Sequence, residues 1–170
     1  MHQPDTIERL PIANLLPYAR NSRTHSPEQV AAVAKSIQEF GFTNPVLIRQ
    51  DGTIIAGHGR VMAARQLGLL DVPCIRLSHL TDEQARAYVI ADNKLAELAG
   101  WDKGLLALEM RELQDFGFDM ALTGFSDAEL SQLLDLKESK LPLVKEYSAD
   151  DFNQFDHQCP KCRFEFNAKT

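Results

Sequence analysis

Residues 53–67 constrain the fold of this chain more than any other stretch, because they join three structural signals without a gap. The run Thr-Ile-Ile at 53–55 is β-branched and predicts a buried strand. Gly57-His58-Gly59 interrupts that run, and apolar residues at helical spacing follow at once. These helical positions are Val61, Ala63, Ala64 and Leu67. The stretch therefore predicts a strand, a tight turn and a helix in immediate succession.

The turn between this strand and this helix is a candidate anion site. The first N–H groups of a helix have no partner within it, and they lie at the positive end of the helix dipole. Arg60, in the first turn, adds a planar guanidinium suited to phosphate. The alternative is a tight turn that binds no ligand and contains glycine only because glycine adopts backbone conformations closed to other residues. Short glycine motifs also match binding signatures by chance. The residues of the turn leave both interpretations open.

The same stretch resembles the signature of a known family. Residues 54–60, followed by Ala63-Ala64 and Leu67-Gly68, are similar to the ParB/sulfiredoxin superfamily. The specific similarity is to ParB-like domains found alone in phage genomes or fused to DNA methyltransferases. Supporting blocks lie in the family's order at 21–26, 36–37, 41–46 and 91–95. The resemblance implies an α+β fold, a compact ParB/sulfiredoxin-like mixed sheet with helices, over about residues 7 to 100.

The resemblance also implies a nucleotide at the turn. ParB binds and slowly hydrolyses CTP, sulfiredoxin uses ATP and a related serine kinase uses ADP, all through this turn. The positions carried over as phosphate-binding are Gly57, His58, Gly59 and Arg60. ParB has Glu where this chain has His58, and sulfiredoxin has its reactive Cys there, so this chain is not a sulfiredoxin. His58 is a candidate phosphate donor or catalytic acid or base, the alternative being a supporting hydrogen bond.

A second block of the resemblance concerns Mg²⁺. Asp92-Asn93-Lys94 is similar to the ParB block Glu-Asn-x-x-Arg, which contacts Mg²⁺ and the phosphates. Asp92 and Asn93 offer the hard oxygen ligands that Mg²⁺ requires, and Asp92 is also a candidate catalytic residue. Asp92 is one methylene shorter than the Glu of the ParB block, and Lys94 is displaced from the position of its Arg. The alternative to a magnesium site is therefore an ordinary polar face of a helix. Further matches in two loops are Asn21, Arg23, Thr43 and Asn44, as candidate contacts to the nucleotide.

Local signals predict the other elements. Ser26, Thr81 and Ser126 are N-cap residues that predict the start of three helices. The glycines that we expect to end helices are Gly41, Gly68, Gly100 and Gly117. Strands are predicted at 7–10, 45–49, 53–56 and 72–77, with the turn Asp51-Gly52 between the middle two. The predicted buried face of the first of these helices includes Phe40. The helix that begins after Thr81 is predicted to run through Tyr88, Leu95 and Leu98 and to end at Gly100.

The chain divides into four predicted parts. They are a ParB/sulfiredoxin-like domain at 1–100, a helical extension at 101–136, a linker at 137–156 and a small tail at 157–170. The net charge of −6 comes entirely from residues 101–170, because residues 1–100 hold ten basic and ten acidic side chains. Between Asp102 and Glu138 there are nine acidic and three basic residues. This charge favours packing or a protein partner over a DNA groove.

The tail carries a second metal hypothesis. Cys159 and Cys162 have zinc-knuckle spacing, and His157 is a candidate third ligand. Structural zinc needs four ligands, and Cys74 lies within a core-strand pattern, where it is expected as a small buried hydrophobe. A second chain would supply the missing ligands in a homodimer. The alternatives are a degenerate knuckle and a redox-active pair.

Composition limits the class of protein. Hydrophobic content of 44% and charged content of 25% are typical of a globular protein, and an odd count of three cysteines argues against a disulfide framework. No apolar run reaches membrane-spanning length, and the first residues lack the features of a signal peptide, so we expect a cytoplasmic protein with no membrane association.

These observations predict a nucleotide-binding (CTP or ATP) ParB-like module associated with DNA modification or DNA handling in a phage or prophage. One alternative is an enzyme, a ParB-like nuclease, an NTPase or a small-molecule kinase. Another is a non-catalytic module that docks a DNA methyltransferase. The chain has no methyltransferase motif, so it does not itself methylate. The predicted partners are a nucleotide, DNA, a DNA methyltransferase and a second copy of the chain.

Overall fold

The computed structural model describes residues 6–136, 157–158, 160 and 165–166. Its main sheet has four strands in the order β1-β4-β2-β3. The strands are β1 (Ile7–Pro11), β2 (Val46–Ile48), β3 (Ile54–Ala56) and β4 (Asp71–Arg76). β2 runs parallel to β4, whereas β1 pairs antiparallel with β4 and β3 antiparallel with β2. The predicted mixed α+β sheet is therefore confirmed, with β1 at an edge.

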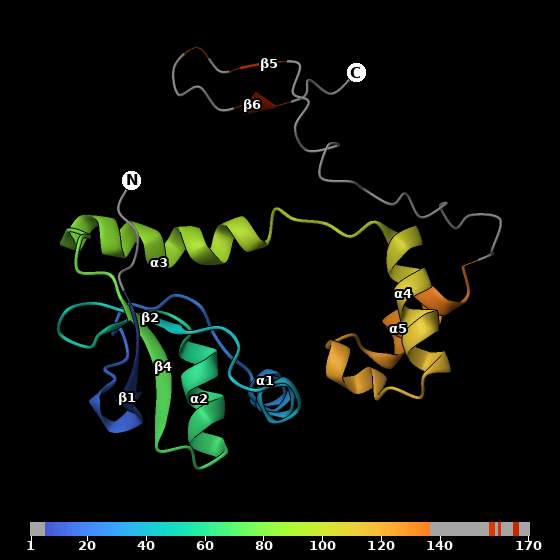
Figure 1. The fold of residues 1–170 in the computed structure, drawn as a ribbon, viewed down its shortest axis with the longest axis horizontal. Coiled ribbons are helices and arrows are strands. Elements are labelled where there is room, and N and C mark those ends of the chain that lie inside the picture. The colour runs from blue at the N-terminus through green and yellow to red at the C-terminus, as the bar shows by residue number, and fades with distance from the viewer. Residues whose placement is uncertain (1–5, 137–156, 159, 161–164, 167–170) are drawn as a thin grey trace.

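Two helices cover the two faces of this sheet, and a third packs on one of them (Figure 1). They are α1 (Pro27–Phe40), α2 (His58–Gln66) and α3 (Asp82–Ala96). Side chains alternate between the faces of a strand, so Ile54 joins the buried cluster that contains Val61 of α2. Its neighbour Ile55 joins the cluster of α3 with Val89. α1 packs on α2 as an outer layer, where Ala34 meets Ala63.

The predicted helix starts are confirmed, and one predicted end is wrong. The hydroxyls of Ser26, Thr81 and Ser126 each accept a hydrogen bond from an N–H of the first helical turn. Gly100 does not end α3, because the helix stops at Ala96 with Glu97 as its C-cap.

Four apolar side chains in or directly after these helices are exposed, among them Phe40, which was predicted as buried. They are Phe40, Tyr88, Leu95 and Leu98, with exposed fractions of 51%, 37%, 64% and 70%. The buried residues of α3, Ala85 and Val89, both lie in its first half. Leu95 and Leu98 lie six and nine residues after Val89, off the face on which Ala85 and Val89 pack against the sheet, and Leu98 lies beyond the last residue of α3.

A second helical unit follows the sheet domain. It consists of α4 (Lys103–Asp115), the 3₁₀ turn η2 (Met120–Thr123) and α5 (Asp127–Leu134), with α4 packed against α5. Arg111 of α4 donates to the carbonyl oxygens of Leu134 and Leu136, which ties the end of α5 to α4. The unit touches the sheet domain where Phe118 stacks on Phe40, with ring centroids 6.2 Å apart.

Two short strands, β5 (His157–Gln158) and β6 (Glu165–Phe166), pair antiparallel near the C-terminus. Within the ranges that the structure describes, no helix is both long enough and apolar enough to cross a membrane.

Candidate functional site

The turn from β3 into α2 is built as the sequence predicts. Gly57 is the N-cap of α2 and has a φ of 100°, which favours glycine. The first hydrogen bond of the helix runs from the Val61 N–H to the Gly57 carbonyl oxygen at 3.0 Å. The N–H groups of residues 58–60 precede that bond, so they are the donors available to a ligand.

Arg60 lies over this turn. Its Nη2 donates to the Pro45 carbonyl oxygen at 3.1 Å, and a Cβ on Gly57 would stand 2.9 Å from the same nitrogen. The Arg60 Nε is buried and has no hydrogen-bond partner in the part of the chain that the structure describes. Burial lowers the pKa of the guanidinium, and the nearby Asp92 acts against that shift. A buried donor left without an acceptor is costly, so this arrangement suits an anion that would supply one.

Four segments meet around the turn in a cavity of about 210 Å³. The predicted site residues that line it are Asn21, Arg23, Gly57, His58, Gly59, Arg60, Asp92 and Asn93. A second cavity of about 430 Å³ shares Gln29, Val33 and Arg60 with the first, and it is lined by Thr43 and Asn44. Lys94 lines neither cavity, because its ammonium lies 3.0 Å from the Glu97 carboxylate.

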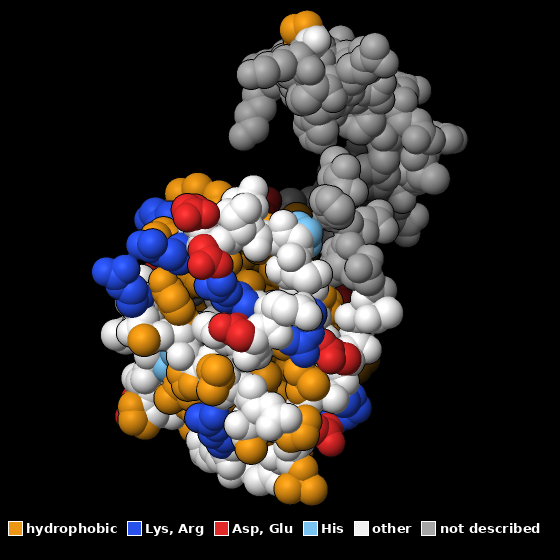
Figure 2. Space-filling model, turned by 90° about the vertical axis from the view of Figure 1, so that its left-hand side faces the viewer, with side chains coloured by type: hydrophobic (Ala, Val, Ile, Leu, Met, Phe, Trp, Pro, Cys, Tyr) orange, Lys and Arg blue, Asp and Glu red, His pale blue; other side chains and the backbone are white. Residues whose placement is uncertain are grey.

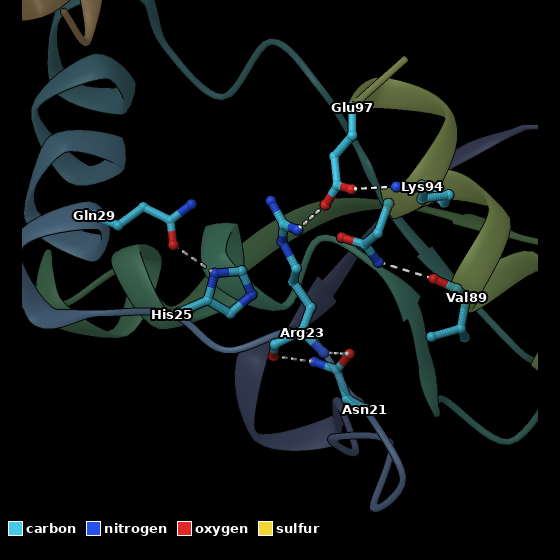
Figure 3. Close-up of polar contacts among 8 residues, drawn as sticks. Asn21, Arg23, His25, Gln29, Val89, Lys94 and Glu97 are labelled. Atoms are coloured by element: carbon cyan, nitrogen blue, oxygen red, sulfur yellow. Dashed lines mark hydrogen bonds and ion pairs between the residues drawn. The ribbon is translucent and has the colours of Figure 1, made fainter.

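The early loop is held in place by its own side chains (Figure 3). The Asn21 Oδ1 accepts from the Arg23 N–H at 3.2 Å, and its Nδ2 donates to the Arg23 carbonyl oxygen at 3.3 Å. The Arg23 guanidinium reaches across to Glu97, just beyond the end of α3, and forms an ion pair with it. Asn21 therefore shapes the loop, while Arg23 and Glu97 join the loop to α3 at the edge of the cavity.

Two further residues of the cavity were not predicted as site residues. The His25 Nδ1 lies 2.9 Å from the Gln29 Oε1, and both side chains line the cavity. The His25 ring stands 3.1 Å from the place that a Cβ on Gly59 would occupy, which explains glycine at that position. The available signal was the position of His25 directly before the helix cap Ser26.

His58 is positioned by its backbone surroundings. Its Nε2 accepts a hydrogen bond from the Tyr18 N–H at 3.3 Å, so the neutral ring carries its proton on Nδ1. Burial lowers the pKa of His58 below its ordinary value of 6.5, and His25 acts in the same direction. His58 is therefore neutral at pH 7, with one nitrogen engaged and the other available to a ligand.

This depressed pKa predicts a pH dependence of stability. Below pH 6.5 the unfolded chain takes up the His58 proton more readily than the folded chain does. The contribution of His58 to the free energy of unfolding is therefore present above pH 6.5 and is lost as the pH falls through its folded pKa. Urea unfolding at stepped pH should show a shallower acid loss for His58→Gln, which keeps an acceptor for Tyr18, than for the wild type. Equal slopes for His58→Gln and the wild type would contradict the assignment.

Asp92 and Asn93 present oxygen atoms to the cavity. The Asn93 Nδ2 donates to the Val89 carbonyl oxygen at 2.8 Å, which leaves its Oδ1 for a ligand. The Asp92 carboxylate accepts no hydrogen bond from the described residues. No group of three or more His, Cys, Asp or Glu side chains suited to a metal occurs among those residues. The two oxygens fit Mg²⁺, which is commonly bound by one or two protein groups together with phosphate and water.

The zinc hypothesis concerns other residues. Cys159 and Cys162 lie outside the described residues, as does the side chain of His157. Cys74, the remaining cysteine, is buried in the core as predicted, and burial raises its pKa to about 11.

Comparison with known proteins gives two family matches. Residues 1–94 match the model of the ParB N-terminal domain. Residues 104–161 match the model of the ParB-methyltransferase HTH domain.

Individual relatives agree with the first match. "ParB-like nuclease domain-containing protein YnaK" of Escherichia coli (strain K12) is 64% identical over 74 residues, which cover 44% of this chain and 85% of YnaK. "Chromosome-partitioning protein Spo0J" of Thermus thermophilus is 34% identical over 91 residues, or 51% of this chain. The match spans 34% of Spo0J, so the chain corresponds to only part of that relative.

A solved structure has the same fold. C-terminally truncated chromosome-partitioning protein ParB from Caulobacter crescentus, complexed with CTP-gamma-S, superposes with a TM-score of 0.65. The superposition covers 79% of this chain and 82% of that protein at 24% sequence identity. At this identity, the similarity establishes the fold and leaves the ligand open.

Proposed function

The chain belongs to the ParB N-terminal domain family, and from that premise we propose that the turn at Gly57 binds a nucleoside triphosphate together with Mg²⁺. The observation that carries the proposal is the buried Arg60 Nε without an acceptor, beside the open N–H groups of residues 58–60. Phosphate oxygens supply acceptors to both sets of donors. CTP is the first candidate, because the Caulobacter crescentus neighbour was solved with CTP-gamma-S.

The rest of the nucleotide has room beyond the phosphates. The cavity of about 430 Å³ continues from Arg60 toward Thr43 and Asn44. We propose that the nucleoside extends into this second cavity, where an amide and a hydroxyl are available to it. Mg²⁺ would be held by Asp92 and Asn93, and it would neutralise charge on the phosphates. Lys94 is not part of this proposed contact set, since it pairs with Glu97.

Titration calorimetry of the full chain tests this proposal. CTP, ATP, GTP and UTP should be added with Mg²⁺ and again with a chelator, at concentrations up to about 1 mM. We expect binding of at least one nucleotide that weakens when Mg²⁺ is removed. Asp92→Asn should reduce the dependence on Mg²⁺, whereas Asp82→Asn, on the same helix but outside the cavity, should not. The absence of binding by every nucleotide at that concentration would reject the proposal.

A catalytic role is the second candidate, and the half-buried His58 in the cavity favours it. The neutral imidazole offers its Nδ1–H to a phosphate oxygen, and its Nε2 would accept a proton as a base on release of the Tyr18 N–H. Phosphate release and cleavage of single- and double-stranded DNA, measured on the wild type and on His58→Gln, separate an enzyme from a binding switch. Tight nucleotide binding without turnover would reject the enzyme and support a protein that binds the nucleotide as a switch.

The wider setting is proposed on the family names. The match of residues 104–161 to the ParB-methyltransferase HTH domain supports a role in DNA handling beside a DNA methyltransferase. The phage or prophage setting, a homodimer and zinc bound by His157, Cys159 and Cys162 also remain proposals. Elemental analysis and light scattering on one preparation test the last two together.

A further inference from the structure

The helical unit that follows the sheet domain is strongly acidic. From Trp101 to Leu136 it holds eight acidic and two basic residues. One of the two, Arg111, is occupied by the carbonyl oxygens at the end of α5, which leaves Lys103 as the other cation. On the face of the molecule in Figure 2, by contrast, basic and acidic side chains are interspersed.

One face of α4 is exposed and has a defined pattern. Leu105, Glu109, Glu112 and Phe116 are spaced at i, i+4, i+7 and i+11, so they form a single line along the helix. We call these four residues the α4 stripe. Its apolar ends are 42% and 84% exposed, and they stand about 16 Å apart at 1.5 Å per residue. The buried residues of this helix, Ala107 and Met110, lie on the opposite face.

The two carboxylates of the stripe are available to a partner. Glu109 and Glu112 form no ion pair within the ranges that the structure describes. Two neighbouring carboxylates repel one another on a helix surface, and exposed apolar side chains gain nothing from water. Neither pair of side chains is buried against another described element. A DNA backbone would be repelled by this face, because DNA binding depends on neutralising phosphates with basic side chains.

We propose that the α4 stripe docks a basic amphipathic helix of a protein partner, with two Lys or Arg residues between two apolar anchors. The charges of such a helix complement those of Glu109 and Glu112, which gives specificity and speeds encounter. Leu105 and Phe116 provide the apolar contacts that hold it, as in other helix-in-groove interfaces. The inference does not depend on the nucleotide proposal, because it concerns a different unit of the chain.

The test uses a synthetic helical peptide with Leu, Lys, Lys and Phe at i, i+4, i+7 and i+11. A scrambled peptide of the same composition, with these residues on different faces, is the matched probe. Binding to the full chain is followed by fluorescence anisotropy at two salt concentrations. We expect the patterned peptide to bind at least about tenfold more tightly than the scrambled one, and binding to weaken with salt.

Variants locate the contact. The double variant Glu109→Lys/Glu112→Lys should lose at least about tenfold in affinity, and Phe116→Ser should also weaken binding. The control Glu28→Lys/Glu39→Lys carries the same change in net charge on α1 of the sheet domain, away from the stripe, and it should keep near wild-type affinity. Circular dichroism confirms that each variant folds.

Three results would overturn the proposal. Equal affinity for the patterned and scrambled peptides would show charge attraction without a docking surface. Tight binding of duplex DNA that survives in Phe116→Ser and strengthens in Glu109→Lys/Glu112→Lys would assign the unit to DNA. A gain in peptide affinity when Lys137, Lys140 and Lys145 are all changed to Glu would mean that the chain's own C-terminal segment occupies the stripe.

Discussion

Replacing Arg60 with alanine is expected to weaken binding of the nucleoside triphosphate about tenfold to a hundredfold. A hydrogen bond to a charged group contributes about 1.5–3 kcal/mol, and each 1.4 kcal/mol is a factor of ten in the dissociation constant. The Arg60 Nη2 donates to the Pro45 carbonyl oxygen, which fixes the guanidinium at the cavity. The Arg60 Nε has no acceptor among the described residues, so it is the donor that a phosphate oxygen would satisfy. The loss should appear in titration calorimetry with Mg²⁺ present.

Two further variants make this result specific. Arg60→Lys keeps the charge but loses the planar fork, so it should bind with an affinity between those of the wild type and Arg60→Ala. Arg65→Ala removes an exposed arginine from the same helix and should leave binding unchanged. Thermal melting should show only a modest effect of Arg60→Ala on folding, about 1 kcal/mol for the lost hydrogen bond to Pro45. Unchanged nucleotide affinity in Arg60→Ala would remove the central feature of the proposed site.

The second large effect concerns Gly57, where Gly57→Ala should impair both folding and nucleotide binding. An L-residue in the left-handed region costs about 1–2 kcal/mol, and Gly57 has a φ of 100°. The new Cβ would also stand 2.9 Å from the Arg60 Nη2 and so displace the guanidinium. We therefore expect a lower melting temperature and a loss of affinity that approaches the loss in Arg60→Ala.

Gly68→Ala is the matched control for this experiment. Gly68 has a φ of 70°, but a Cβ there would meet nothing within 4 Å. Its replacement should cost a similar amount of folding free energy, because the backbone strain is similar, and should leave nucleotide affinity intact. If both variants lose affinity equally, the effect comes from destabilisation and the contact between Gly57 and Arg60 is not responsible.

Short-range signals in the sequence were sufficient for most of the secondary structure. A helix cap such as Ser26 or Thr81 acts on an N–H three residues away, so its effect can be read within one turn of chain. The left-handed turn at Gly57 and the strand before it are likewise set by adjacent residues. For the same reason, the candidate site was predicted where it follows a continuous motif, at residues 57–60.

Other parts of the site depend on residues far apart in the chain. Arg23 pairs with Glu97 across 74 positions, and the Tyr18 N–H meets His58 across 40. No periodicity or cap reports such contacts, and so Glu97 and His25 were absent from the predicted set. Lys94 lies in the motif at 92–94, and its ammonium pairs with Glu97.

The sequence also could not predict which apolar side chains are exposed. Leu95 and Leu98 lie six and nine residues after Val89, so they do not share the face of Ala85 and Val89, and Leu98 lies beyond the end of α3 at Ala96. Of these three apolar residues only Val89 is buried, because its face is the one that meets the sheet. A hydrophobic pattern indicates that burial of a helix face would be favourable in free energy. It does not indicate which other element of the fold will pack against that face. The sequence by itself determined the local elements and the turn at Gly57, whose causes lie within a few residues. The tertiary structure alone decided which of those faces were covered and which distant side chains completed the cavity, since both depend on where the chain brings separate elements together.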